Sequence, residues 1–253
     1  MDQDAVLLSI AGHIARITLN RPGQHNALAT GDIALFRERL DAVEANPDAR
    51  VLVLTGSGER TFCAGASLKQ FQTGDMSGEL FTTLTGQLAA LRIPSVCALN
   101  GSVFGGGAEI ALCCDYRIGV RGSRMLVPAA RIGICYPLDG LKRYVDKLGL
   151  SAAKRILVAS EELSDEDMLR IGFLHRVVEA AELEACARDF AEHIAGLAPM
   201  AVQAMKRLLG DIGRGAVDEG EARRLSEACS GSADFQEGLA AQRERRKPYF
   251  SGR

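Results

Sequence analysis

The 253-residue sequence lacks the features that mark membrane-spanning, nucleic-acid-binding and metal-binding chains. No apolar run approaches the roughly 18 residues of a membrane span, and Met1-Asp2-Gln3-Asp4 does not resemble the start of a secretory signal. Lysine and arginine total 30 against 32 aspartates and glutamates, so no excess of positive charge points to nucleic acid. The four histidines are scattered without ligand spacing, so we expect no metal site.

Cysteine pairing is also missing from the sequence. The seven cysteines are odd in number and include no Cys-x-x-Cys pair. Cys113 and Cys114 are adjacent within an apolar stretch, which is typical of small hydrophobic residues in a reducing compartment. We therefore expect a cytoplasmic protein. With 47% hydrophobic and 25% charged residues, the composition is that of a globular chain long enough for one α/β domain with a full core.

The most informative part of the chain is the stretch 97–115. An apolar, strand-like run ends at Asn100-Gly101, three glycines follow at 105–107, and an apolar helix continues with Glu109 as its one charged residue. Glycines in a helix cost about 1 kcal/mol each relative to alanine. They also let another group approach the N–H donors at the positive end of the helix dipole. This stretch predicts an oxyanion hole beside a proton-transfer group.

A purely structural interpretation of the same stretch stays open. The three glycines would then serve only to pack the helix tightly on a strand. Glu109 would pair with an arginine elsewhere in the chain or with a neighbouring subunit.

Strands and helices alternate through most of the chain. Two β-rich runs at 5–10 and 14–19 flank Ala11-Gly12-His13, which predicts a hairpin. Thr30 is a candidate N-cap for an amphipathic helix that ends near Asn46-Pro47. Residues 51–55 form a short, continuous apolar run, which is typical of a strand covered on both faces. Further strands are expected at 95–99, 116–120 and 125–127, and helices at 138–147 and 151–159.

From Ser164 onward the pattern becomes chiefly helical. A short helix capped by Ser164 and a strand at 175–178 precede amphipathic helices at 181–197, 200–209, 216–230 and 233–246. We therefore predict an α/β fold with a mostly parallel sheet, with an α/β core at 1–195 and a helical region at 196–253. Because apolar stripes on such a tail often pack against another subunit, we expect a homo-oligomer.

A second glycine-containing turn follows the strand at 51–55. Gly56-x-Gly58 fails as a dinucleotide fingerprint, because Thr61 stands where the third glycine belongs. The segment 65–69 fails as a nucleophile elbow, because it lacks the second glycine. As one wall of an anion pocket it fits: Gly65 permits an unusual backbone conformation, and the N–H of Ala66 would open the short helix that follows.

Over its whole length the chain resembles the crotonases, the enoyl-CoA hydratase/isomerase superfamily. Several separate motifs carry the resemblance, in the right order: Ile17-Thr-Leu-Asn-Arg-Pro, Asn26-Ala-Leu28, Phe62-Cys-Ala-Gly-Ala66, Asn100-Gly with Gly-Gly-Gly-Ala-Glu109 and Cys114-Asp115, Ala198-Pro199 with Lys206, and Lys247-Pro-Tyr-Phe250 with Gly252-Arg253.

The resemblance implies a fold of repeated ββα units with C-terminal helices that assemble trimers or pairs of trimers. It also implies an acyl-CoA substrate, with coenzyme A as part of that substrate and no separate cofactor. The backbone amides of Ala66 and Gly106 would polarise the thioester carbonyl. Residues around them would line the adenine and pantetheine path (Ala64, Ala66 and Leu68) and its opposite wall (Ala27 and Leu28).

Two residues near the C-terminus also match the family. Lys247 and Phe250 resemble a terminal pair that touches the nucleotide, often from a neighbouring subunit. The alternative for Lys247 is a solvated charge in the basic run 243–247.

The sequence departs from the family at one important position. Typical hydratases of this family hold water between two glutamates, and Glu109 matches the first. The second should follow Pro128, where this chain has Ala129, and a methyl group can neither accept nor donate a proton. Asp139 and Tyr136 are candidate replacements. Their alternatives are a charge at a helix N-terminus for Asp139 and plain packing for Tyr136.

The expected activity is therefore enoyl-CoA hydratase/isomerase chemistry through a stabilised thioester enolate, with Glu109 as the acid/base. The loss at Ala129 leaves two alternatives open. One is a divergent reaction on the same enolate, such as decarboxylation, C–C bond hydrolysis or another lyase step. The other is a CoA-binding scaffold without catalysis.

Overall fold

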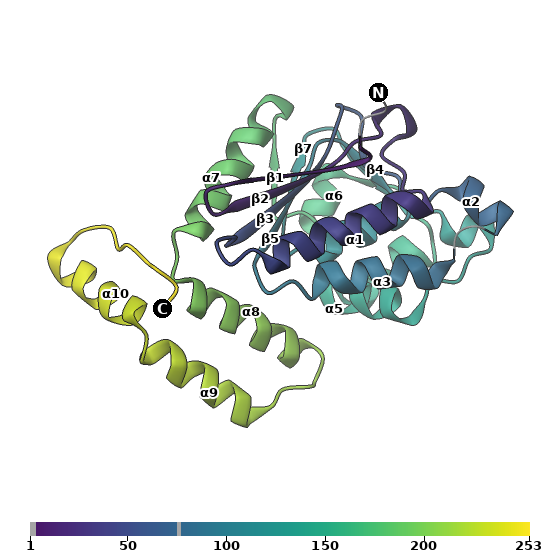
Figure 1. Ribbon diagram of the computed structural model, residues 1–253. Helices are drawn as coiled ribbons and strands as arrows, with labels where there is room; N and C mark the ends of the chain where they lie inside the picture. The colour runs from purple at the N-terminus through teal and green to yellow at the C-terminus, as the bar shows by residue number, and fades with distance from the viewer. Residues whose placement is uncertain (1–3, 75–76) are drawn as a thin grey trace.

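The computed structural model describes residues 4–74 and 77–253, apart from the side chains of Leu68 and Phe71. Its strands form two sheets (Figure 1). The larger sheet contains, in spatial order, β1 (Val6–Ala11), β2 (Ile14–Leu19), β3 (Val51–Gly56), β5 (Ser95–Leu99), β7 (Tyr116–Val120) and β10 (Arg176–Val178). The smaller sheet contains β4 (Thr61–Cys63), β6 (Ser102–Phe104), β8 (Arg124–Leu126) and β9 (Leu163–Ser164).

Helices cover both faces of the larger sheet and form a separate C-terminal group. Within the described ranges, no helix is both long and apolar enough to cross a membrane. The α-helices are α1 (Thr30–Ala45), α2 (Leu68–Thr73), α3 (Gly78–Ala89), α4 (Gly106–Cys113), α5 (Leu138–Leu157), α6 (Asp165–Arg170), α7 (Leu183–Ala195), α8 (Pro199–Gly213), α9 (Glu219–Ser230) and α10 (Ala233–Glu244). Short 3-10 turns lie at Pro22–Gln24, Ala129–Ile132 and Ala180–Glu182.

The chain repeats a ββα unit, as the resemblance implies. In three successive units the first strand (β3, β5 or β7) joins the larger sheet and the second (β4, β6 or β8) joins the smaller one. The larger sheet is parallel from β2 to β10, and β1 alone runs antiparallel, as the hairpin partner of β2. The predicted α/β fold with a mostly parallel sheet is therefore confirmed.

Strand β3 shows why this sheet is buried on both faces. Val51 and Val53 point into a cluster with α7, whereas Leu52 and Leu54 point into the main core with α1, α3 and α4. Because side chains alternate along a strand, a run without polar residues fits a strand only when both faces are covered. The continuous apolar run at 51–55 is explained in this way.

The start of α1 differs from the prediction by one residue. Ala29, rather than Thr30, is the N-cap, and its backbone N–H donates to Asp32 Oδ2 (3.0 Å). The side chain of Thr30 instead contacts Gln70 of α2, with 3.1 Å between Thr30 Oγ1 and Gln70 Oε1. A cap made from the third helical residue is harder to recognise in a sequence than a serine or threonine at the cap itself.

Helix α3 is absent from the sequence prediction, whereas α2 is the short helix that the sequence predicts after Ala66. The N-cap of α3 is Ser77, which accepts a hydrogen bond from the N–H of Leu80 (3.2 Å). Phe81, Leu84 and Leu88 then repeat at helical spacing and are buried in the main core. This helix places Phe81 and Thr85 beside α4, where the candidate site lies.

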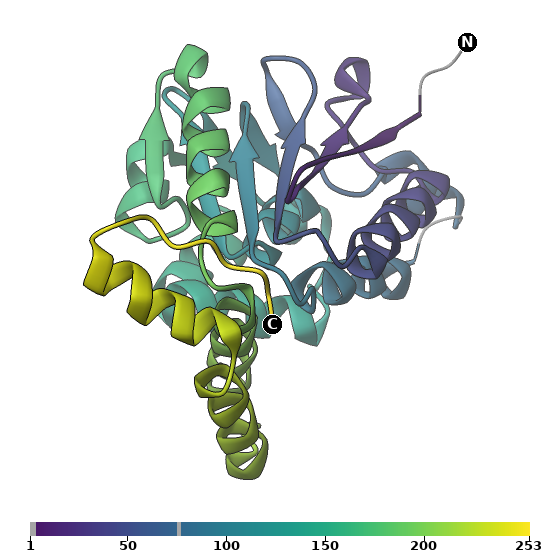
Figure 2. The same ribbon diagram turned by 60° about the vertical axis from the view of Figure 1, so that its left-hand side comes forward.

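Helices α8, α9 and α10 extend away from the sheets, and the C-terminal tail folds back toward the junction of α7 and α8 (Figures 1 and 2). The predicted division at 195/196 falls in the turn between α7 and α8. On α8, the apolar side chains of Met205, Leu209 and Ile212 are exposed by 56%, 68% and 60%. An apolar surface of this kind fits the expected subunit contact.

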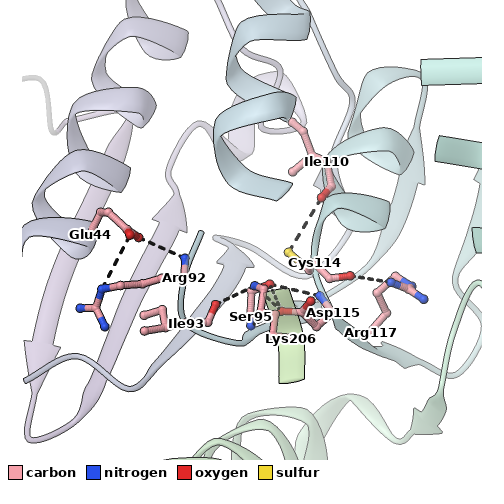
Figure 3. A network of polar contacts seen from close by, with 9 residues as sticks. All are labelled: Glu44, Arg92, Ile93, Ser95, Ile110, Cys114, Asp115, Arg117 and Lys206. Carbon is pink, nitrogen blue, oxygen red and sulfur yellow. Dashed lines mark hydrogen bonds and ion pairs between the residues drawn. The ribbon is translucent and has the colours of Figure 1, made fainter. Parts of the chain in front are cut away.

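A partly buried ionic contact attaches α8 to the α/β core (Figure 3). Lys206 Nζ donates to Asp115 Oδ2 and to the backbone oxygen of Ile93, both at 2.7 Å. The same Asp115 oxygen accepts from the N–H of Ser95 (2.8 Å). Asp115 lies two residues beyond α4, so this contact also fixes the far end of the helix that carries Glu109.

Arg117 is a buried cation in contact with His175. Arg117 Nη1 donates to the backbone oxygen of Cys114 (2.7 Å), and its N–H donates to His175 Nδ1 (3.0 Å). Burial, followed by the positive charge of Arg117, lowers the pKa of His175 from its usual 6.5 to about 4.

This pKa shift predicts a pH dependence of stability. Because His175 takes up a proton more readily in the unfolded chain, the free energy of unfolding should fall as the pH drops from about 6.5 toward 4. Urea unfolding of the wild type and His175→Gln across this range measures the effect. The variant should lose less stability than the wild type, and parallel curves for the two proteins would contradict the assignment.

Candidate active site

The loop after β4 and the first turn of α4 meet through glycine backbones. A Cβ placed on Gly65 would lie 2.5 Å from the Gly106 amide nitrogen, and one placed on Gly107 would lie 2.2 Å from the Cys63 oxygen. Gly65 also has φ +84°, in the left-handed region that L side chains rarely adopt. Any side chain at these two positions would push the loop away from the helix. The glycines therefore allow the two backbones to approach closely.

Two backbone amides at this contact have no hydrogen-bond acceptor among the described residues. Ala66 pairs with Leu28 through bonds from Leu28 N to Gly65 O (2.8 Å) and from Ser67 N to Leu28 O (2.9 Å). In that bridge the N–H of Ala66 is not used. The N–H of Gly106 belongs to the first residue of α4, which has no intrahelical acceptor. Neither amide donates to another residue in the described part of the chain.

Asn26 holds the Ala66 loop in place. It is buried and adopts φ +53°, a conformation that asparagine tolerates better than most residues. Its Nδ2 reaches the backbone oxygens of Ser57, Thr61 and Phe62 at 3.0, 2.9 and 3.1 Å. One side chain thus connects the end of β3 with β4 and fixes where the following loop begins.

Glu109 lies one turn inside α4 and is only 4% exposed. Its Oε1 is 2.5 Å from Arg143 Nη1 of α5 and accepts from Thr85 Oγ1 of α3 at 3.3 Å. Burial raises the pKa of Glu109 above its ordinary value, while the nearby Arg143 charge and the Thr85 hydrogen bond act in the opposite direction. The alternative that Glu109 pairs with an arginine is therefore correct, and it leaves Oε2 without a partner among the described residues.

The N-terminus of α5 comes very close to Glu109. A Cβ on Gly140 would lie 3.3 Å from both carboxylate oxygens and 2.8 Å from the Tyr136 ring. Tyr136 is half-buried and packs edge-on against Tyr144, with ring centroids 5.8 Å apart. Burial, then the charge of Glu109, raises the pKa of Tyr136 well above its ordinary value, so its phenol stays protonated at neutral pH.

The two candidates to replace the second glutamate differ in position. Asp139 lies in the first turn of α5 and is exposed, as expected for a charge at a helix N-terminus. Its charge is still felt at Glu109, where it raises the pKa. Tyr136 is partly buried and packs against the main core, beside Tyr144. Ala129 is buried at 8% exposure.

Four of the residues expected along the coenzyme A path lie around the loop that carries Ala66. Leu28 is buried beside Ala66, and Ala27 and Ala64 are partly exposed nearby, with Ala64 N donating to the His25 oxygen (3.0 Å). Leu68 begins α2, and its side chain lies outside the described residues. These positions surround the loop that carries Ala66.

Lys247 and Phe250 do not lie beside the loop that carries Ala66. The backbone oxygen of Phe250 accepts from Arg50 Nη2 (2.9 Å), and Arg50 directly precedes β3. The candidate site lies beyond the opposite, C-terminal end of that strand. One chain therefore does not bring the terminal pair to Ala66, and the expectation that a neighbouring subunit supplies it stays a prediction.

Comparison with known proteins decides the family. The sequence model described as enoyl-CoA hydratase/isomerase matches residues 9–253. The chain belongs to this family.

Relatives and solved structures with enoyl-CoA hydratase names align with nearly the whole chain. The (E)-benzylidenesuccinyl-CoA hydratase of Thauera aromatica is 34% identical, covering 98% of this chain and 99% of that protein. The short-chain-enoyl-CoA hydratase of Clostridium acetobutylicum is 31% identical, covering 98% and 97%. A crystal structure of an enoyl-CoA hydratase/carnithine racemase from Magnetospirillum magneticum superposes with a TM-score of 0.93 at 27% identity, covering 100% of this chain and 97% of that one.

Sequence reasoning missed two residues of this site, Arg143 and Thr85. Arg143 follows Glu109 by 34 residues and Thr85 precedes it by 24, so no short spacing links them. A weak signal for Arg143 exists in retrospect. A buried carboxylate needs a cation, and Gly140 in the first turn of α5 has no side chain to keep this helix away from Glu109.

The contact between Gly65 and Gly106 predicts a clear result for substitution. Gly65→Ala should lower the free energy of unfolding by about 1–3 kcal/mol, because it combines a positive φ with a clash against backbone. Thermal or urea denaturation measures this loss. Gly86→Ala is the matched control, since nothing lies within 4 Å of its Cβ position inside α3. That variant should gain up to about 1 kcal/mol, and equal effects at the two positions would contradict the close contact.

Proposed function

We propose that this chain is a hydratase-type enzyme that acts on an acyl-CoA thioester through a stabilised enolate. The amides of Ala66 and Gly106 bind the thioester oxygen, and Glu109 moves the proton. The observation that carries the proposal is the approach of Gly65 to Gly106, which places these two unpaired amides on adjoining backbone with Glu109 one turn further along the same helix. Family membership and the hydratase names of the relatives support the same chemistry.

The two amides supply the electrostatic part of the reaction. When water adds to a 2-enoyl thioester, negative charge develops on the thioester oxygen as the enolate forms. Fixed N–H dipoles stabilise that charge without reorganising, and each donor in comparable sites contributes about 3 kcal/mol. The dipole of α4 adds to the donor at Gly106, because this residue is the first of the helix.

Glu109 supplies the proton transfer. Its carboxylate takes a proton from water while the hydroxyl adds to Cβ, and it returns that proton to Cα when the enolate collapses. One carboxyl group is then base and acid in turn, and the sum of the steps is addition of one water across the double bond. A pKa raised by burial suits both roles, since a proton is taken up and released most easily near the operating pH.

The coenzyme A portion would follow the loop around Ala66, between Ala64 and the α2 segment on one side and Ala27-Leu28 on the other. Lys247 and Phe250 would reach the nucleotide from a neighbouring subunit. The proposed assembly is accordingly a homotrimer or a pair of trimers, formed through the exposed apolar faces of α8 to α10.

Glu109→Gln tests the proton-transfer role. Hydration of crotonyl-CoA and longer 2-enoyl-CoAs should fall by about 10²- to 10⁴-fold, because the amide cannot take up the proton of water. The measurement is the steady-state loss of enoyl absorbance. Glu79→Gln, at an exposed glutamate in the first turn of α3, is the control and should keep the wild-type rate. Equal rates for wild type and Glu109→Gln would remove Glu109 from the mechanism.

Ala129 favours a second candidate function, a different lyase step on the same enolate. Decarboxylation of a malonyl-type thioester needs the oxyanion amides but no second carboxylate, and C–C hydrolysis of a β-keto acyl-CoA is related. A panel of enoyl-, malonyl-type and β-keto acyl-CoAs distinguishes the two candidate functions. If the protein turns over malonyl-type or β-keto acyl-CoAs and leaves enoyl-CoA unchanged, the result would support this second function and contradict hydration. Acyl-CoA binding by calorimetry without any turnover would indicate a scaffold.

A further inference from the structure

The ion pair of Glu109 and Arg143 has an asymmetry that matters for the proposed reaction. Both Arg143 Nη1 and Thr85 Oγ1 contact the same carboxylate oxygen, Oε1. The other oxygen, Oε2, has no hydrogen-bond partner among the described residues. Because two groups from different helices hold one oxygen, the orientation of the carboxylate is fixed and Oε2 is the atom left for chemistry.

Arg143 is itself held in a confined place. Its side chain is 13% exposed and that of Glu109 is 5% exposed, so solvent screens the pair weakly. Such a pair is strongly coupled, and removing one partner leaves an uncompensated buried charge. A buried carboxylate without a cation takes up a proton at higher pH, which would remove the base.

The other groups around Glu109 cannot substitute for Arg143. From α3 comes the neutral Thr85, and from α4 the thiol of Cys113, whose pKa is raised by burial. The phenols of Tyr136 and Tyr144 also stay protonated, because burial raises both pKa values. Asp139 is an anion and opposes ionisation of Glu109. Arg143 is thus the one cation in contact with the carboxylate in the described part of the chain.

We propose that Arg143 is a positioning residue that binds Oε1 of Glu109, keeps the group a carboxylate and leaves Oε2 to carry the proton. It compensates for the second carboxylate that is absent at Ala129, because a single base must be both oriented and ionised without a partner acid. The effect of Arg143 on catalysis rests on the proposed function. The effect of Arg143 on the protonation of Glu109 can be measured in the free protein and does not depend on that function.

The activity test compares pH profiles of kcat/KM for crotonyl-CoA hydration. Arg143→Gln should move the acid limb upward by about one pH unit or more, since loss of an opposite charge at contact distance favours the protonated acid. It should lower kcat above that limb and leave KM little changed. Arg143→Lys should lie close to the wild type, and Lys142→Gln, which removes an exposed charge one residue away, should not move the limb. A merely structural role would lower stability without shifting the profile, and that result would overturn the proposal.

A second measurement separates this inference from the proposed function. The carboxylic acid infrared band of Glu109, identified by its loss in Glu109→Gln, is titrated in the substrate-free protein. In Arg143→Gln its midpoint should rise by the same amount as the acid limb, with Arg143→Lys and Lys142→Gln near the wild type. An unchanged midpoint overturns the role of Arg143 even if hydration is observed. A shifted midpoint in a protein that hydrates no enoyl-CoA supports the electrostatic role and overturns the proposed function instead.

Discussion

The candidate site depends on the close approach of two backbone segments, the loop at Gly65 and the first turn of α4. Hydrogen-bond donors that stabilise developing charge must be fixed before the reaction begins, because reorganising them in the transition state would cancel the gain. Here the fixing is done by packing: Gly65 touches Gly106, and Gly107 touches the Cys63 oxygen. The smaller sheet and Asn26 hold one side of this contact, and helix α4, which is buried from Gly107 to Cys113, holds the other.

The ionic groups of the core serve the same helix at both ends. Arg143 meets Glu109 near its start, and Lys206 meets Asp115 just beyond its end. Ion pairs of this kind contribute little net stability, because the charges lose their hydration. What they provide is a defined position and protonation state. This property matters for the proposed reaction, because Ala129 occupies the position where the resemblance implies a second glutamate.

Local patterns in the sequence were enough for much of the fold. The hairpin at Gly12, the run Val51-Leu-Val-Leu and the cap at Ser164 each specify an element through spacing or turn chemistry alone. The glycine stretch before Glu109 likewise predicted a buried helix beside unpaired amides. Helix α3 was missed, because its threonines and glycine dilute the apolar repeat of Phe81, Leu84 and Leu88. The partner of Glu109 could not be predicted, since only the tertiary packing of α5 brings Arg143 to it.

The most direct test of the central claim is the state of a bound thioester carbonyl. Butyryl-CoA, which cannot be hydrated, is labelled with ¹³C at the thioester carbon and bound to the protein for isotope-edited infrared spectroscopy. If the amides of Ala66 and Gly106 converge on its oxygen, the carbonyl stretch should lie at lower frequency than in free solution, because both donors polarise the bond. A bound ligand whose carbonyl frequency equals that of free butyryl-CoA would contradict the account.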